Sequence, residues 1–193
     1  MKRLAVYCAS SLGNDPIFAD VARHVGRTLA ARGIGLVYGG GRLGLMGLVA
    51  DAALEAGGEV IGVIPEVLRD AEVAHTGCTE LHIVANMHQR KAMMTDLADG
   101  FVTIPGGIGT MDELFEALSW AQLGYHAKPC GLVNVAGFYD HLTAFLDGVV
   151  AAGLLRPAHR ANLVEAGTIE ELLDKFADHK IAPSVVQMVR RDL

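Results

Sequence analysis

GFVTIPGGIGTMDE, at residues 100–113, predicts a short strand that passes through a glycine-rich turn directly into a helix. A strand followed at once by a helix is the repeating unit of parallel α/β folds. The same alternation continues in both directions along the chain. Apolar runs typical of strands are expected at 3–9, 34–38, 59–64, 80–85, 128–135 and 162–165. Helical patterns are expected at 15–31, 44–56, 87–98, 138–152 and 168–178.

This order predicts an α/β fold with a doubly wound, mostly parallel sheet and helices on both faces. The length of 193 residues suits one domain, and 51% of the residues are hydrophobic, which is enough for a core. We expect a single nucleotide-binding domain at 1–180. Residues 181–193 show no clear pattern and are expected to form a C-terminal tail.

Composition also narrows the expected partners and location. The net charge is −6 and no run of Lys or Arg forms a basic stripe, so a nucleic acid polymer is not an expected partner. No apolar segment reaches the roughly 20 residues of a membrane span, so no membrane partner is expected either. Cys8, Cys78 and Cys130 form no CxxC pair, which favours buried free thiols and a cytoplasmic location.

The turn at 105–110 (PGGIGT) predicts a binding site for a single phosphate. Glycines allow the backbone N–H groups to turn toward a ligand, and the N-terminus of the following helix adds about half a positive charge. Thr110 can add a hydroxyl donor. No Lys follows the glycines as it does in a Walker loop, so a triphosphate with Mg²⁺ is not expected.

Three other loops should surround the same crevice, because ligands of parallel sheets bind outside the carboxyl ends of the strands. They are Ser10–Gly13, Gly39–Gly44 and Asn86–Lys91. Arg90 and Lys91 begin a helix, where positive charge opposes the helix dipole. A ligand anion, or an acidic partner such as Glu113, explains them better than helix stability does.

Several of these features have a second interpretation. Gly39, Gly41 and Gly44 match the dinucleotide pattern G-x-G-x-x-G, but they follow the second strand, and the third strand ends without the acid that would bind a ribose. We therefore favour a close backbone approach to a mononucleotide. The hydroxyls of Ser10 and Ser11 could contact a base or ribose, or cap the next helix. Thr110-x-x-Glu113 is also a capping box, and spacing leaves this and a ribose-facing Glu113 equally open.

PGGIGTMDE fits the pattern PGGxGTxxE, with MHQRK upstream of it. Together with YGGGRLGLMG, GVIPE and SWAQLGYHAKPCGLVNVAGFYDHL, these motifs resemble the LOG family of cytokinin riboside 5′-monophosphate phosphoribohydrolases, often labelled lysine decarboxylases. The similarity runs from about residue 3 to about residue 155. It implies a Rossmann-like fold and hydrolysis of a plain or N6-substituted adenosine 5′-monophosphate to free base and ribose 5-phosphate. It also implies a homodimer with active sites at the subunit interface.

The motif match implies that Arg90 and Glu113 are catalytic and that Gly106–Thr110 binds the phosphate. No cofactor and no metal is expected. The residues expected to bind substrate are Ser10, Gly39, Gly40, Met87, Arg90, Lys91, Gly106, Gly107, Ile108, Gly109, Thr110 and Glu113. Ile108 stands where the family often has an aromatic residue, and Met111-Asp112 where it often has Leu-Glu. These departures leave the preferred base open.

Three rival functions are weighed against this one. A non-catalytic nucleotide-binding module could share the fold. A pyridoxal-phosphate decarboxylase needs a Schiff-base lysine, but neither Lys91, Lys128, Lys175 nor Lys180 lies in a persuasive setting. An NAD(P) oxidoreductase would need the dinucleotide interpretation of the second glycine loop.

Overall fold

The computed structural model describes residues 1–69 and 73–186. Its described part contains a seven-stranded sheet in the order β4-β3-β2-β1-β5-β6-β7, and every pairing in it is parallel. The prediction of a doubly wound parallel sheet is therefore confirmed. The strands are β1 Arg3–Tyr7, β2 Gly35–Tyr38, β3 Val60–Pro65, β4 Glu80–Val84, β5 Phe101–Thr103, β6 Cys130–Val133 and β7 Leu163–Ala166.

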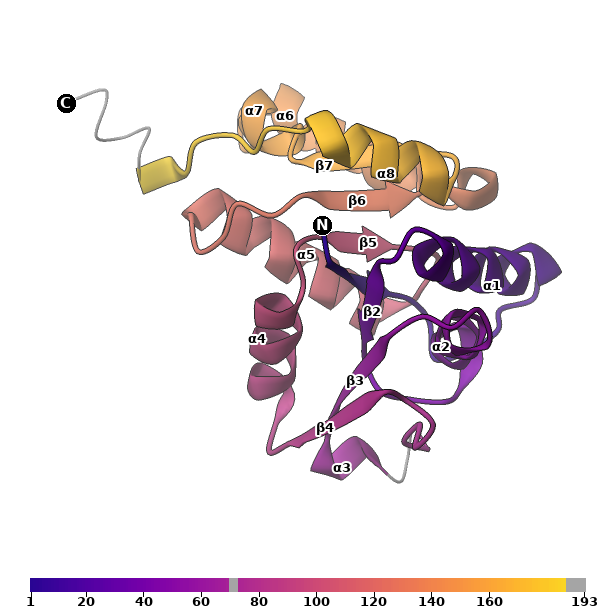
Figure 1. Ribbon diagram of the computed structural model, residues 1–193. Helices are drawn as coiled ribbons and strands as arrows, with labels where there is room; N and C mark the ends of the chain where they lie inside the picture. Colours follow the sequence, from indigo (N-terminus) through magenta and orange to yellow (C-terminus); the bar gives the residue numbers. More distant parts are fainter. Residues whose placement is uncertain (70–72, 187–193) are drawn as a thin grey trace.

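Helices cover both faces of this sheet (Figure 1). One face carries α1 Pro16–Ala31, α2 Gly44–Glu55 and α8 Ile169–Asp178. The other carries α4 Met87–Leu97, α5 Ile108–Leu123 and α6 Asp140–Ala151. The short elements are α3 Glu66–Arg69, the 3-10 turn η1 Val135–Gly137 and α7 Pro157–Arg160. Within the described residues, no helix combines the length and apolarity needed to cross a bilayer.

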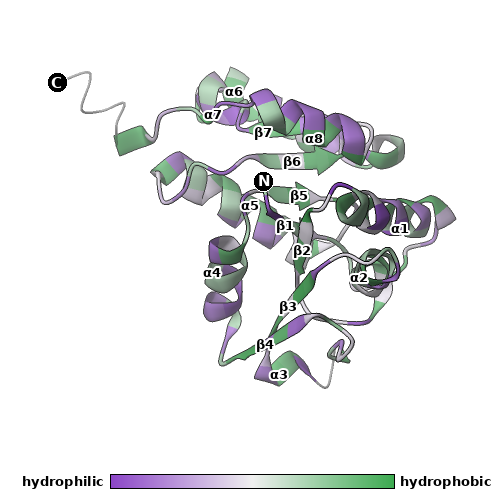
Figure 2. Cartoon of the chain, viewed as in Figure 1, coloured by the Kyte–Doolittle hydropathy of each residue, from purple (hydrophilic) through white to green (hydrophobic). Residues whose placement is uncertain are grey.

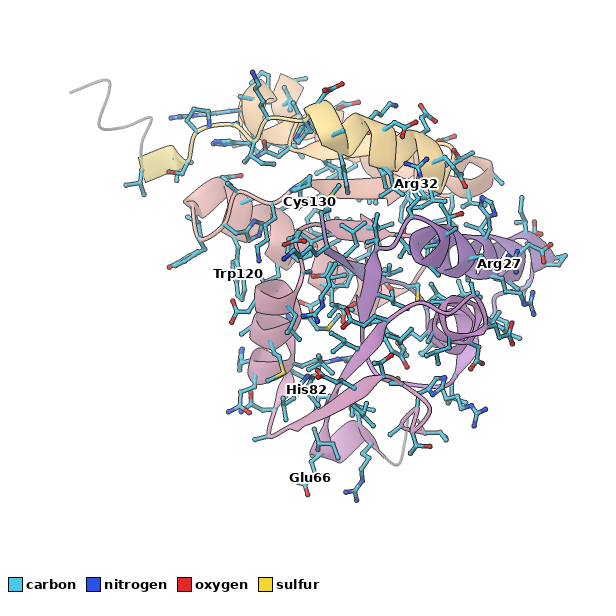
Figure 3. All side chains as sticks on the ribbon, viewed as in Figure 1. Arg27, Arg32, Glu66, His82, Trp120 and Cys130 are labelled. Carbon is cyan, nitrogen blue, oxygen red and sulfur yellow. The ribbon has the colours of Figure 1, made fainter. Side chains whose placement is uncertain are left out.

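Strands inside the sheet, such as β3 and β6, are apolar along their whole length because helices cover both faces, as their hydropathy colouring shows (Figure 2). The edge strand β4 is more polar and partly exposed. In β1, Leu4 and Val6 pack toward α1 and α2, while Ala5 and Tyr7 pack toward α4. An ion pair joins the C-terminal end of α1 to α8: Arg32 Nη1 lies 3.0 Å from Asp174 Oδ1 (Figure 3). The core thus holds the sheet rigid between two helical layers.

The strand order reverses between β1 and β5, and this reversal decides where a ligand can bind. From β1 the chain proceeds through β2, β3 and β4 to one edge, then returns to β5 and continues to the other edge. At such a switch point the loops that follow the two central strands diverge and leave a crevice at the carboxyl ends. Here the two loops begin at Cys8 and Ile104.

Most helix boundaries agree with the sequence patterns because their caps are local. Asp15 caps α1 by accepting a hydrogen bond from the Ile17 N–H at 3.0 Å, and Asn86 caps α4 by accepting one from Gln89 at 3.0 Å. Gly33, at φ +67°, follows the end of α1 in the left-handed conformation expected of a C′ residue. The hydroxyl of Ser10 is therefore not needed as a helix cap.

Other boundaries differ from the prediction. The strand expected at 59–64 extends one residue further, because Pro65 is the last residue of β3, in register with Val84. The strand expected at 128–135 is shorter, because η1 takes its last residue. The four-residue helix α7 was not predicted, since a single turn is too short to show a helical period.

The packed structure continues past residue 180, where the tail was predicted to begin. Ala182 donates its N–H to Asn162 Oδ1 at 2.9 Å, and His159 Nε2 lies 3.2 Å from the carbonyl oxygen of Pro183. Ser184 is buried. Residues 187–193 of the predicted tail lie outside the described residues.

Candidate active site

A cavity of about 220 Å³ opens at the switch point. Its walls come from the end of β1, the first turns of α2 and α4, and the loop that leads into α5. The lining residues are Cys8, Ala9, Ser10, Ser11, Met46, Arg90, Gly107, Ile108, Gly109, Thr110 and Glu113. Four regions that are distant in sequence therefore meet at one place. Three of them contain predicted loops, but the fourth contributes Met46 of α2 and not the predicted loop Gly39–Gly44.

The glycine loop presents the N-terminus of α5 to this cavity. The helix begins at Ile108 with Gly107 as its N-cap, and no side chain caps it. A Cβ atom added at Gly107 or Gly109 would meet nothing within 4 Å, so protein packing does not require glycine at either position. The start of α5 thus lies on the cavity wall without a side-chain cap, and an uncapped helix N-terminus is an arrangement that binds phosphate in other proteins.

The structure resolves the two interpretations of Glu113. Because α5 begins at Ile108, Thr110 is the third residue of the helix and not its N-cap. Thr110 is buried and its side chain packs beside Gly106, where an added Cβ would lie 2.1 Å from Oγ1. A capping box between Thr110 and Glu113 is therefore wrong, and Glu113 lies on the cavity wall.

Arg90 is a buried cation, with 5% of its surface exposed. Its Nε donates to the carbonyl oxygen of Val63 at 3.2 Å, and its Nη2 donates to that of Gly39 at 3.0 Å. A Cβ at Gly39 would lie 2.0 Å from Nη2. Glycine at position 39 is therefore what allows the guanidinium to lie against the end of β2.

The second glycine of interest in this loop, Gly44, has a different packing role. A Cβ there would lie 2.2 Å from the backbone carbon of Ser10. Because the two backbones are so close, the first turn of α2 forms hydrogen bonds with the loop that follows β1. Leu45 donates its N–H to the carbonyl oxygen of Ser11 at 3.3 Å, and Met46 donates its N–H to that of Ala9 at 3.2 Å. Met46 enters the cavity wall as a result.

The charges of Glu113 and Arg90 affect the pKa values of residues at the end of β1 and just after it. Burial raises the pKa of Tyr7 well above its usual value, the negative charge of Glu113 raises it further, and Arg90 opposes that rise. Burial and then Glu113 also raise the pKa of Cys8. Both effects favour the neutral thiol of Cys8, whereas the thiolate is the nucleophilic form.

Lys91 follows Arg90 in the chain but lies elsewhere. Its Nζ is 2.7 Å from Asp112 Oδ2 and 3.4 Å from Glu116 Oε1, so it joins α4 to α5. Partial burial lowers the pKa of Lys91, but its hydrogen bond with Asp112 and the charge of Glu116 raise it overall. The ammonium thus balances two carboxylates rather than facing the cavity.

The residues expected to bind substrate therefore divide into two groups. Those on the cavity wall are Ser10, Arg90, Gly107, Ile108, Gly109, Thr110 and Glu113. Those outside the wall are Gly39, Gly40, Met87, Lys91 and Gly106. Gly39 holds Arg90, and Met87 Sδ lies 3.8 Å from Arg90 Nη1. Ser11, whose hydroxyl was weighed with that of Ser10 as a contact for base or ribose, also lies on the wall. Sequence reasoning missed Cys8, Ala9 and Met46, because apolar side chains in a strand, a loop or a helix give no local signal of a binding site.

By its all-parallel sheet and the cavity at its switch point, the protein belongs to the Rossmann-like class of α/β proteins. Comparison with known proteins narrows this class. A family model described as "Possible lysine decarboxylase" matches residues 46–176. The chain belongs to this family, which is the LOG family.

Similar proteins carry names that agree with one another. A probable cytokinin riboside 5′-monophosphate phosphoribohydrolase of rice (Oryza sativa subsp. japonica) is 47% identical over 92% of this chain and 84% of its own length. A cytokinin riboside 5′-monophosphate phosphoribohydrolase of Arabidopsis thaliana is 46% identical over the same shares.

Solved structures agree on the fold. The X-ray structure of TM1055 superposes with a TM-score of 0.70 at 26% identity, covering 93% of this chain and 100% of that one. The molybdenum cofactor carrier protein of Chlamydomonas reinhardtii, at 20% identity, has a TM-score of 0.66 over 92% of this chain and 99% of its own. The second likeness concerns the fold alone.

Proposed function

We propose that this protein hydrolyses the N-glycosidic bond of an adenosine 5′-monophosphate, plain or N6-substituted, to free base and ribose 5-phosphate. The observation that carries the proposal is one cavity lined both by the uncapped start of α5 and by Arg90 and Glu113. The names of the relatives, at 46–47% identity, support it. No group other than substrate and water is needed for the reaction.

Each group of site residues has a role in the reaction that follows from its charge. The amides of Gly107–Thr110 hold the 5′-phosphate, which fixes the sugar over the cavity. As the bond to the base breaks, positive charge builds on the ribose ring, and the carboxylate of Glu113 stabilises it and orients the attacking water. The departing base gains negative charge, which the fixed cation of Arg90 offsets. Water supplies the hydroxyl of the sugar and the proton of the base.

The direct test is to incubate the purified protein with AMP and, separately, with isopentenyl-adenosine monophosphate, and to measure free base by chromatography. We expect base from at least one of them, and little from the matching nucleosides, which lack the phosphate. Binding of both nucleotides without release of base would contradict hydrolysis and favour a nucleotide-binding module. The ratio of the two rates gives the base preference.

The phosphate position has its own prediction. Gly107 has extended backbone angles that alanine also adopts, and an added Cβ would point into open space. We expect Gly107→Ala to leave the melting temperature unchanged and to raise KM for the nucleotide by about 10-fold or more, because the methyl group occupies the place of the phosphate. Steady-state kinetics and thermal melting measure the two effects. An unchanged KM would place the phosphate elsewhere.

We also propose a homodimer whose interface lies beside the active site. Ile108, at the cavity mouth, is 87% exposed, and Phe115 lies two helical turns further along the same side of α5. Phe115 borders a groove of about 370 Å³ between α5, α6 and α7, and two other apolar residues of this groove, Phe145 and Leu154, are 64% and 83% exposed. A second copy that covers this face would bury the apolar surface and close over the cavity mouth.

Phe145→Glu is expected to convert the dimer to a monomer, because a charge would have to be buried in the interface. Light scattering coupled to size-exclusion chromatography measures the mass. Val67→Glu, at a 76% exposed apolar position on α3, is the matched control and should leave the dimer intact. A dimer that survives Phe145→Glu would exclude this face as the interface.

The redox state of the cysteines is relevant to the cellular compartment of the protein. Cys8, Cys78 and Cys130 are free thiols, the state that a reducing compartment maintains. We propose that the protein works in the cytoplasm, which cell fractionation tests.

A further inference from the structure

The segment that leads into β4 lies against the glycine loop after β2. His75 donates its N–H to the carbonyl oxygen of Gly40 at 2.9 Å, and Arg42 donates its N–H to that of Val73 at 3.0 Å. Gly41 and Ala74 form an antiparallel bridge between these two bonds. The loop that offers the Gly39 carbonyl to Arg90 is thus paired with a second segment of chain.

The side chain of His75 ties this second segment to α2. His75 is 3% exposed, and its Nε2 lies 2.9 Å from Oδ1 of Asp51. Its Nδ1 accepts a hydrogen bond from the Gly77 N–H at 3.1 Å. Because a backbone N–H can only donate, Nδ1 carries the lone pair, and Nε2 donates its proton to Asp51. Both ring nitrogens are engaged, so the imidazole is held in one tautomer and one orientation.

The loop that His75 holds consists of backbone alone. Three consecutive buried glycines, Gly39–Gly41, have no side chains that could fix them, and Gly40 is in the left-handed region at φ +76°. Packing against β3 and the hydrogen bond from His75 therefore fix Gly40, and with it the direction of the neighbouring Gly39 carbonyl. That carbonyl in turn accepts from Arg90 Nη2 at 3.0 Å.

We propose that His75, oriented by Asp51, is a positioning residue that holds the guanidinium of Arg90 in its working place. The connection runs from Asp51 through the His75 side chain and backbone to Gly40, and from the adjoining Gly39 to Arg90. The part of the inference that concerns reaction rate rests on the proposed function of Arg90; the part that concerns its position does not.

A matched control is available in the same molecule. His126 is a partly buried histidine whose Nδ1 accepts a hydrogen bond from the Lys128 N–H at 3.2 Å, the same kind of contact that His75 Nδ1 makes with Gly77. It follows α5 and lines neither the cavity nor the groove between α5, α6 and α7. Replacing either imidazole by a methyl group removes buried ring atoms and this hydrogen bond, so a general loss of stability should affect both variants.

We expect His75→Ala to lower kcat for base release by about 100-fold with a much smaller change in KM, since a displacement of the order of 1 Å in a catalytic group has effects of this size. His126→Ala should keep kcat near that of the unaltered protein. In an Arg90→Ala background, His75→Ala should lower kcat no further, because its effect passes through Arg90. Asp51→Asn, which keeps an acceptor oxygen for His75, should retain most of the rate that Asp51→Ala loses.

A second measurement is independent of activity. The Nε–H of Arg90 is buried against the Val63 carbonyl, so its ¹⁵N-resolved NMR signal should exchange slowly with solvent. His75→Ala should shift this signal and speed its exchange, and His126→Ala should do neither. An unchanged signal and an unchanged kcat in His75→Ala would overturn the inference. If the unaltered protein released no base at all, the proposed function would fail, and the NMR signal would still decide whether His75 positions Arg90.

Discussion

Glu113→Gln is expected to lower kcat for base release by about 1,000-fold while leaving nucleotide binding nearly unchanged. The substitution preserves the size of the side chain and one acceptor oxygen, and removes only the negative charge. That charge matters most when the ribose ring becomes positive, which happens in the transition state and not in the bound substrate. The loss should therefore appear in kcat and not in the dissociation constant measured by calorimetry.

Glu116→Gln is the control for this variant. Glu116 lies one helical turn further along α5 and contacts Lys91, with 3.4 Å between Oε1 and Nζ, away from the cavity wall. The same chemical change there should leave kcat close to that of the unaltered protein. Turnover by Glu113→Gln at the unaltered rate would show that the role assigned to Glu113 is wrong.

Gly39→Ala is expected to lower kcat by about 100-fold without unfolding the protein. The new Cβ would lie 2.0 Å from Nη2 of Arg90, and the end of a long side chain can move away more easily than backbone can. The backbone of Gly39 is not in the left-handed region, so alanine adds no strain of its own. The guanidinium must then leave the Gly39 carbonyl, which moves its charge relative to the substrate.

Thermal melting and kinetics on the same samples test this expectation. Gly148→Ala, on the exposed side of α6, is the control for a glycine-to-alanine change: its Cβ would meet nothing within 4 Å. It should raise stability by about 0.5–1 kcal/mol, since glycine inside a helix costs conformational entropy, and should leave kcat unchanged. A Gly39→Ala protein with full activity would mean that the contact between Gly39 and Arg90 has no part in catalysis.

Much of the fold could be predicted because its signals are local. Apolar runs, caps such as Asp15 and Asn86, and Gly33 after α1 are each recorded within a few residues of sequence. The errors fall where a contact distant in sequence decides. Pro65 stays in β3 because it pairs with Val84, and 181–184 are held by Asn162 and His159.

The candidate site was predicted in part, for the same reason. A glycine turn that opens a helix is local, so the amides of Gly107–Thr110 were found from sequence alone. Glu113 could not be assigned by spacing, since the capping box requires the helix to begin three residues after Ile108, where the structure begins it. The first residue of α5 depends on the conformation of the loop between β5 and α5.

Arg90 and Lys91 show what sequence and tertiary structure each determined. The sequence placed both cations in the first turns of one helix, near the crevice of a parallel sheet, and it determined the alternating elements and the glycine turn that make this crevice. Successive residues of a helix point about 100° apart, so neighbours in sequence face different surroundings. Only the packed structure decided that Arg90 turns to the carbonyls of Val63 and Gly39 while Lys91 turns to the carboxylates of α5.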